Sequence, residues 1–159
     1  MKAVCCGSFD PITKGHEDIV RRAARIFDEV VVLLGKNPEK ECFFSAEIRR
    51  ALCEKTFSDL KNVSVDLCDG IVAEYAKSIG ACVLVKGVRS LSDLEYENHL
   101  ADINRMVVPE IETVYLPARP ELAAISSTYA RSFITSGKDC SSVLPKAILD
   151  DIENYRKDV

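Results

Sequence analysis

Apolar residues along the chain gather in short runs that alternate with longer segments of mixed character. Five runs rich in apolar residues predict strands, over 2–6, 29–35, 62–67, 82–87 and 112–116. Most of these runs are continuously apolar rather than alternating, which is typical of strands covered on both faces of a sheet. The pattern therefore predicts buried, parallel strands.

The segments between the runs carry apolar residues at helical spacing. Six helices are expected, over 16–27, from Ser45 to about 56, and over 70–79, 92–107, 127–135 and 143–156. In the first helix, Ile19, Ala23, Ile26 and Phe27 share one face. Ser45 is a favourable N-cap, and Gly80 is a typical residue at a helix end.

Strands that alternate with helices in this way predict a single α/β domain. We expect a Rossmann-like, doubly wound, five-stranded parallel sheet with helices on both faces. Ligands of such sheets bind beyond the carboxyl ends of the strands, where the strand order reverses. The segments after the first, second, fourth and fifth strands should therefore face one crevice; they are 7–16, 35–45, 86–93 and 117–128.

Composition narrows the class of protein. The chain is 47% hydrophobic and 29% charged, which is typical of a folded globular protein rather than a disordered one. Its formal net charge of −4 argues against a broad nucleic-acid-binding surface. The apolar runs are too short to cross a membrane, which takes about 20 residues, and no secretory signal is seen. We expect a cytoplasmic protein without a nucleic-acid or membrane partner.

Seven cysteines show no CxxC spacing. Cys5 and Cys82 lie in apolar runs, where a thiol usually acts as a small core residue, so we expect both to be buried. Zinc binding and disulfides are disfavoured by the spacing. No protein metal ligand is predicted.

The most informative segment is "GSFDPITKGH", residues 7–16, between the first strand and the first helix. Gly7 lets the backbone leave the strand, and Pro11 stiffens the turn. His16 falls in the first helical turn, where free N–H groups favour an anion. Its ring could donate to a phosphate oxygen, or it could merely cap the helix.

Neither GxGxxG nor GxxxxGK[ST] occurs in the chain. The turn instead resembles the signature of the nucleotidyltransferase superfamily, with Thr13 and His16 in its TxGH form. Four blocks are similar, in order and spacing, to those of bacterial phosphopantetheine adenylyltransferases: "FDPITKGHEDIVRRA", "VLVKGVRSLSDLEYE", "LADINR" and "AAISSTYAR".

This resemblance implies that residues 1–159 form one nucleotidyltransferase domain, with the helices from about 127 packing on the same core. It implies transfer of the adenylyl group of ATP to 4′-phosphopantetheine, giving dephospho-coenzyme A and pyrophosphate. The attack would be direct and in line, without a covalent enzyme intermediate. Mg²⁺ would arrive with ATP, coenzyme A would be a feedback inhibitor, and the protein would be a homohexamer.

The resemblance also implies roles for individual residues. His16 would stabilise the transition state, with Lys40 and Arg89 as further catalytic cations. The acceptor would be bound by Ser8, Lys40, Val72 and Lys86. The nucleotide site would comprise Ser8, Phe9, His16, Gly87, Val88, Arg89, Glu97, Leu122, Ala123, Ala124, Ile125, Ser126, Ser127 and Thr128.

Three of these residues depart from the family pattern. Ser8 replaces a threonine and keeps its hydroxyl, while Leu122 stands where an aromatic residue is often found. Lys86 replaces the commoner arginine, so a point charge replaces a bidentate donor.

Other interpretations stay open at this point. A relative in the same superfamily could adenylylate nicotinamide mononucleotide or cytidylylate a polyol phosphate. A regulator on the same fold could bind ATP without transferring it. Lys40 could be a solvated surface charge, the "ISST" run a plain helix cap, and Glu97 and Arg105 a pair on a helix surface.

Overall fold

The computed structural model describes residues 1–35 and 42–158. Five parallel strands form one sheet: β1 (Lys2–Gly7), β2 (Glu29–Gly35), β3 (Val63–Cys68), β4 (Val83–Val88) and β5 (Glu112–Pro117). Their order is β3-β2-β1-β4-β5, so the order reverses between β1 and β4. The predicted doubly wound sheet is confirmed, with every strand within one residue of its expected bounds.

The helices follow the strands in the expected order. They are α1 (Lys14–Ile26), α2 (Ala46–Thr56), α3 (Val72–Ser78), α4 (Leu91–Val107), α5 (Ser127–Thr135) and α6 (Leu149–Asp158). Two 3₁₀ turns complete them, η1 (Pro120–Leu122) and η2 (Lys146–Ile148). The helix predicted over 143–156 was wrong at its start: Pro145 is extended and lacks an N–H, so α6 begins after it.

Local signals in the sequence set several helix ends. Ser45 accepts a hydrogen bond from the N–H of Ile48, as expected of an N-cap. Gly80 follows α3 with a φ of 72°, a conformation that side chains with a Cβ rarely adopt.

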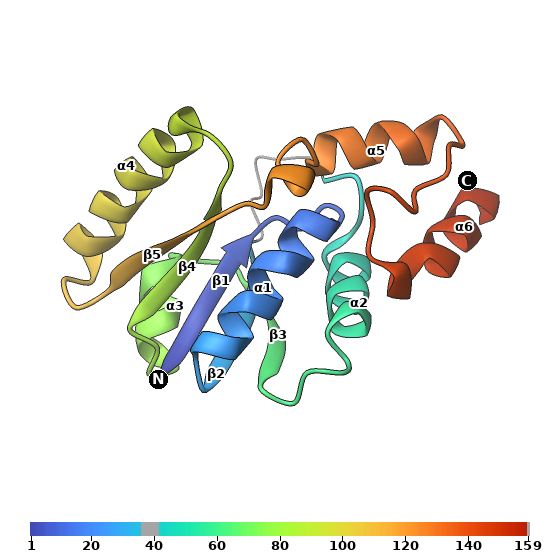
Figure 1. Ribbon diagram of the computed structural model, residues 1–159. Helices are drawn as coiled ribbons and strands as arrows, with labels where there is room; N and C mark the ends of the chain where they lie inside the picture. The colour runs from blue at the N-terminus through green and yellow to red at the C-terminus, as the bar shows by residue number, and fades with distance from the viewer. Residues whose placement is uncertain (36–41, 159) are drawn as a thin grey trace.

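The two faces of the sheet carry two separate apolar clusters. Alternate residues of β1 point to opposite faces, so Ala3 and Cys5 join one cluster and Val4 joins the other. The larger cluster includes residues of α1, α2, α5 and α6, and the smaller one is covered by α3. Figure 1 shows α1 in front of the sheet and α3 behind it.

Two burial predictions were wrong. Ile26 is 61% exposed, because α1 buries Ile19, Val20 and Ala23 instead. Cys82 is exposed, because it precedes β4 at the amino-terminal edge of the sheet rather than lying within the strand.

The helix α4 differs from the other long helices. All of it lies in the described part of the chain, and none of its residues is fully buried. Its exposed apolar side chains include Leu91 and Met106, which are 80% and 84% exposed. No helix among residues 1–35 and 42–158 has the length and apolar character needed to span a membrane.

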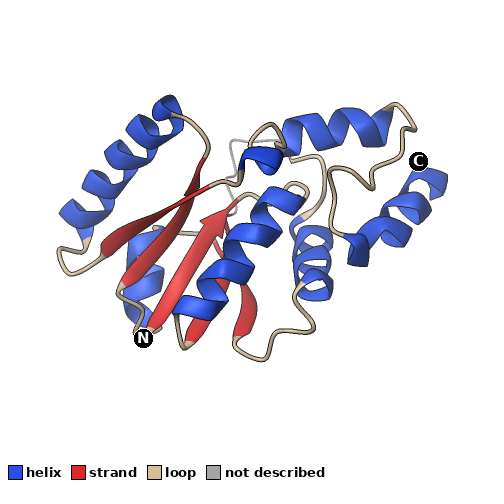
Figure 2. Cartoon of the chain, in the orientation of Figure 1, coloured by secondary structure: helices blue, strands red, loops and turns tan. Residues whose placement is uncertain are grey.

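The carboxyl end of β1 points toward a group of loops between α4 and α5 (Figure 2). The sheet topology thus brings together loops that are far apart in the sequence.

Candidate active site

A cavity of about 390 Å³ opens where the strand order reverses. It is lined by the ends of β1 and β4, the turn into α1, the start of α4, and the segment from Ala118 to Ser127. Segments after β1, β4 and β5 therefore share one cavity, as the sheet order predicts. Residues 36–41 of the segment after β2 lie outside the described part.

Most of the predicted site residues lie in this cavity. Those that line it are Ser8, Phe9, His16, Lys86, Gly87, Arg89, Glu97, Leu122, Ile125, Ser126 and Ser127. Five others do not line it: Val72, Val88, Ala123, Ala124 and Thr128. Lys40 lies outside the described residues.

Some lining residues were not assigned a role from the sequence. Thr13 and Gly15 belong to the TxGH turn, and Asp93 and Tyr96 follow Arg89 on α4. A signal for Asp93 was present, because it lies in the first turn of α4, four residues after Arg89, where its carboxylate can pair with that guanidinium. Cys5 and Cys6, which also line the cavity, could be placed there only by the strand register.

The turn after β1 has an unusual backbone at its centre. Phe9 has a φ of 46°, in the left-handed region that residues other than glycine rarely adopt. Its buried ring stands edge-on to the ring of His16, with 5.0 Å between the ring centroids. The buried Asp10 carboxylate accepts hydrogen bonds from the N–H groups of Phe43 and Phe44, at 2.8 and 2.9 Å. The turn is thereby tied to the segment before α2.

His16 both caps α1 and faces the cavity, so the two interpretations of this residue are compatible. The Thr13 hydroxyl accepts a hydrogen bond from the backbone N–H of His16, and the Thr13 N–H donates to His16 Nδ1 at 3.1 Å. Because Nδ1 is an acceptor, the neutral ring carries its hydrogen on Nε2. Burial, assisted by the nearby Arg89 charge, lowers the pKa of His16 from 6.5 to about 4. Near neutral pH the ring is therefore a neutral Nε2–H donor.

Lys86 lines the same cavity, beside Cys6. The β1–β4 register pairs Cys5 with Val85, so Cys6 and Lys86 occupy the next positions of adjacent strands. The Lys86 ammonium lies 3.1 Å from Glu97 Oε2 of α4. Burial by itself lowers the pKa of Lys86, but Cys6 and Glu97 outweigh it and raise the pKa above the usual value. Lys86 is therefore a partly buried cation.

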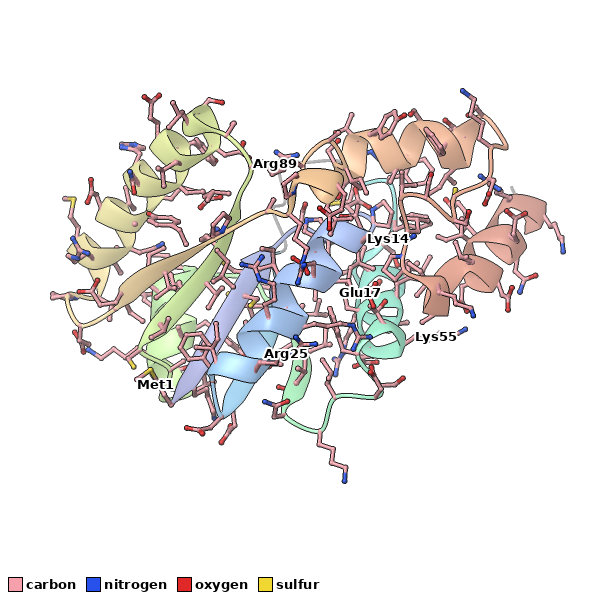
Figure 3. All side chains as sticks on the ribbon, viewed as in Figure 1. Met1, Lys14, Glu17, Arg25, Lys55 and Arg89 are labelled. Atoms are coloured by element: carbon pink, nitrogen blue, oxygen red, sulfur yellow. The ribbon has the colours of Figure 1, made fainter. Side chains whose placement is uncertain are left out.

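Arg89 lies just before α4, between β4 and the N-cap Ser90, and faces the segment that leads into α5 (Figure 3). Its Nε is 2.8 Å from Asp93 Oδ2, one helical turn along. The alternative in which Glu97 and Arg105 form a pair on the helix surface is not observed; eight residues apart, they are too distant for the direct contact of an i,i+4 pair. Glu97 pairs with Lys86, and Arg105 pairs with Glu112.

Ser126 and Ser127 line the cavity at the N-terminal end of α5. Ser126 is its N-cap and accepts a hydrogen bond from the N–H of Tyr129. Ser127 Oγ donates to the carbonyl oxygen of Pro11 at 2.9 Å. The "ISST" run is therefore a helix cap, as the plain interpretation held, and this cap also lines the cavity.

Gly87 allows α1 to approach β4 closely. A Cβ at this position would lie 2.9 Å from Ile19 Cγ1, which is too close for two carbon atoms. This close packing brings the first turn of α1, and with it His16, near the end of β4.

The arrangement suits a polyanionic ligand. The free N–H groups of two helix N-termini and the His16 Nε2–H supply neutral donors, and Lys86 and Arg89 supply positive charge. Within the described residues, no three histidine, cysteine, aspartate or glutamate side chains form a potential metal site.

Comparisons with known proteins agree with this geometry. Residues 4–133 match the model of the cytidylyltransferase-like family. Phosphopantetheine adenylyltransferase from Rubrobacter xylanophilus is 43% identical over 150 residues, covering 94% of this chain and 92% of that protein. The enzyme of the same name from Bdellovibrio bacteriovorus is 42% identical over 152 residues, covering 96% and 95%. The chain belongs to the phosphopantetheine adenylyltransferase family.

More distant solved structures share the fold. A Vibrio parahaemolyticus protein assigned as a nicotinate-nucleotide adenylyltransferase superimposes with a TM-score of 0.76 at 17% identity, over 98% of this chain and 93% of that one. A bifunctional NMN adenylyltransferase/ADP ribose pyrophosphatase from Francisella tularensis gives 0.73 at 15% identity, over 98% of this chain and 49% of that one.

Proposed function

We propose that the chain transfers the adenylyl group of ATP to 4′-phosphopantetheine, giving dephospho-coenzyme A and pyrophosphate. Residues 1–159 would act as one nucleotidyltransferase domain. The observation that carries the proposal is the similarity to phosphopantetheine adenylyltransferases over almost the whole chain. It is supported by the cavity, which gathers the TxGH turn and the starts of α4 and α5 at one edge of the sheet.

The acceptor phosphate serves as the nucleophile in the proposed reaction. Its second pKa is about 6, so most of it is a dianion near neutral pH and needs no strong general base. One of its oxygens forms a bond to the α-phosphorus of ATP while the bond to the β-phosphate oxygen breaks, and pyrophosphate leaves in line. No covalent enzyme intermediate forms. The protein contributes positioning and charge stabilisation.

The Nε2–H of His16 would donate to an oxygen of the α-phosphoryl group as charge develops there. Arg89 would add positive charge from α4, and Lys40 would do so from the segment after β2. The acceptor phosphate would lie at Ser8 and Lys86.

The other residues assigned to the two binding sites are supported by two different kinds of observation. Cavity placement supports nucleotide contacts from Phe9, Gly87, Glu97, Leu122, Ile125, Ser126 and Ser127. For Val72, Val88, Ala123, Ala124 and Thr128 the support is the family resemblance alone.

Mg²⁺ would enter as part of the ATP complex, with phosphate oxygens and water as its main ligands. Coenzyme A contains the product's skeleton and would compete at the same cavity. A cytoplasmic homohexamer is the proposed working form. The exposed apolar side chains of α4 support an assembly, because they would be buried against another subunit.

Pyrophosphate release is the direct test of this function. The purified protein is incubated with Mg·ATP and, in separate reactions, 4′-phosphopantetheine, nicotinamide mononucleotide or no acceptor, and also with Mg·CTP and glycerol 3-phosphate. We expect release only with 4′-phosphopantetheine. Release with another acceptor would place the chain with a different superfamily activity, and ATP binding without any release would indicate a nucleotide-binding regulator.

A further inference from the structure

Two guanidinium groups outside the cavity hold the turn that carries Ser8 and Phe9. Arg49 of α2 is buried, and its Nη1 donates to the carbonyl oxygen of Ser8 at 2.6 Å. Arg131 of α5 donates through Nη1 to the carbonyl oxygen of Asp10, also at 2.6 Å. The two carbonyls flank Phe9, whose φ is 46°. Neither arginine lines the cavity.

The Arg49 contact also sets the direction of the Phe9 N–H. The Ser8 carbonyl and the Phe9 N–H belong to one trans peptide plane, in which they point in opposite directions. Holding the carbonyl toward α2 therefore turns the N–H away from α2. This N–H donates to no acceptor within the described part of the chain. Since Ser8 and Phe9 both line the cavity, it is available to a ligand there.

The conformation of this turn depends on such contacts. A non-glycine residue in the left-handed region persists only where its surroundings hold it. Hydrogen bonds from a charged guanidinium are stronger than those between neutral groups. Arg49 is 3% exposed, and its Nε has no hydrogen-bond partner among the described residues. A buried donor without a partner costs stability, which favours a role for Arg49 beyond packing.

Arg131 connects the turn to the N-terminal end of α5. Its Nη2 donates to Thr128 Oγ1 at 3.0 Å, in the first turn of that helix. Ser127 Oγ makes a second connection, to the carbonyl oxygen of Pro11. The turn and the start of α5 are thereby fixed relative to each other.

We propose that Arg49 and Arg131 are positioning residues for the nucleotide. They hold the Ser8–Asp10 turn in its left-handed conformation and in register with α5, so that the Phe9 N–H and the N-terminus of α5 face the same phosphates. This inference rests on the proposed adenylyl transfer and adds two residues that touch neither substrate.

The experiment compares each arginine with a matched arginine elsewhere. Arg131→Met is paired with Arg156→Met, because Arg156 likewise donates to backbone carbonyls, those of Phe133 and Ile134 at the other end of α5. Arg49→Met is paired with Arg50→Met, whose exposed guanidinium contacts Glu54 on the same helix. Arg49→Lys and Arg131→Lys test rescue by a conservative change.

ATP affinity is measured by calorimetry without acceptor, and kcat and KM by pyrophosphate release. Arg49→Met and Arg131→Met should each raise the Kd for ATP at least about fivefold and lower kcat by a similar factor. The KM for 4′-phosphopantetheine should change less, within about twofold. Arg50→Met and Arg156→Met should stay within about twofold in every constant. The lysine variants should recover part of the loss, because an ammonium keeps the positive charge and can donate, but lacks the planar guanidinium geometry that reaches two acceptors in fixed directions.

The amide resonance of Phe9 gives a readout that does not depend on turnover. ATP should shift it in the wild type and in Arg156→Met, and should shift it much less in Arg49→Met and Arg131→Met. Unchanged ATP affinity and an unchanged Phe9 response in folded Arg49→Met and Arg131→Met would overturn the inference. If Arg49→Met fails to fold, the same result in Arg131→Met alone would overturn it. A wild type that binds ATP but releases no pyrophosphate would refute the proposed function. The ATP affinity and the Phe9 amide shift would still test whether Arg49 and Arg131 position the turn for the nucleotide.

Discussion

The two walls of the cavity meet a ligand with different chemistry. The wall formed by the turn after β1 and by α1 and α5 presents neutral donors, such as the Nε2–H of His16, fixed by hydrogen bonds to nearby backbone. The wall formed by β4 and α4 presents Lys86 and Arg89, each already paired with a carboxylate, Glu97 or Asp93.

This difference indicates that the two walls have different roles in the reaction. The neutral wall can receive negative charge without giving up a partner, which suits charge that develops in the transition state. On the charged wall, a phosphate must compete with a carboxylate for each cation. That exchange suits ground-state binding and release. We therefore expect substitution of His16 to act mainly on kcat and substitution of Lys86 mainly on KM.

The largest expected effect comes from His16→Ala on the neutral wall. Losing one preorganised donor typically lowers the rate by about 10²–10³-fold, so kcat should fall by that order while the KM for ATP changes much less. His99→Ala, an exposed residue on α4 outside the cavity, is the matched control and should leave kcat unchanged. A His16→Ala enzyme with normal kcat would contradict the claim that the neutral wall stabilises the transition state.

The same residue should make stability depend on pH. The unfolded chain restores the ordinary His pKa of 6.5, whereas the folded value is about 4. Between these values the unfolded state binds the proton and the folded state does not, so the unfolding free energy should decline as pH falls from 6.5 to 4. A shift of this size corresponds to at most about 3 kcal/mol. Urea denaturation across this pH range should show that the unfolding free energy declines less in His16→Asn than in His99→Asn. Equal declines in the two variants would contradict the burial of a neutral His16.

A smaller effect is expected for Lys86 on the charged wall. Lys86→Ala should raise the KM for 4′-phosphopantetheine by about 10- to 100-fold, the usual contribution of a charge-assisted hydrogen bond, and affect the KM for ATP less. Lys77→Ala removes a surface lysine that pairs with Glu110 and serves as the control. Lys86→Arg should be tolerated. Equal losses for both substrates would place Lys86 elsewhere.

The smallest effect concerns the thiols. Cys82 is exposed at the far edge of the sheet, and burial raises the pKa of Cys5 to about 12, so iodoacetamide should modify Cys82 first. Turnover should be unchanged at that stage, as it should be in Cys82→Ser. Modification of Cys6, beside Lys86, should then inhibit the enzyme, and bound 4′-phosphopantetheine should slow it. If activity were lost in step with Cys82 labelling, this would contradict the placement of Cys82 outside the cavity.

The order of the elements could be predicted from the sequence because each signal is local. Continuous apolar runs predicted the five strands within one residue, and N-cap residues such as Ser45 and Ser126 predicted helix starts. The errors arose where burial depends on distant neighbours. Ile26 fits the apolar face of α1 by spacing, and Cys82 extends an apolar run, yet both side chains are exposed.

The sequence by itself determined the family, and with it the candidate phosphate-binding residues, because the TxGH turn and the blocks around it are contiguous patterns. Only the tertiary structure decided their partners. Parallel pairing of β1 with β4 places Cys6 beside Lys86, and the crossover through α4 brings Glu97 to the same ammonium. The hydrogen bond from Arg49 to Ser8 spans 41 positions in the sequence, and the one from Arg131 to Asp10 spans 121 positions. Such contacts leave no periodic or local trace in the sequence, because they are set by how the chain crosses the sheet.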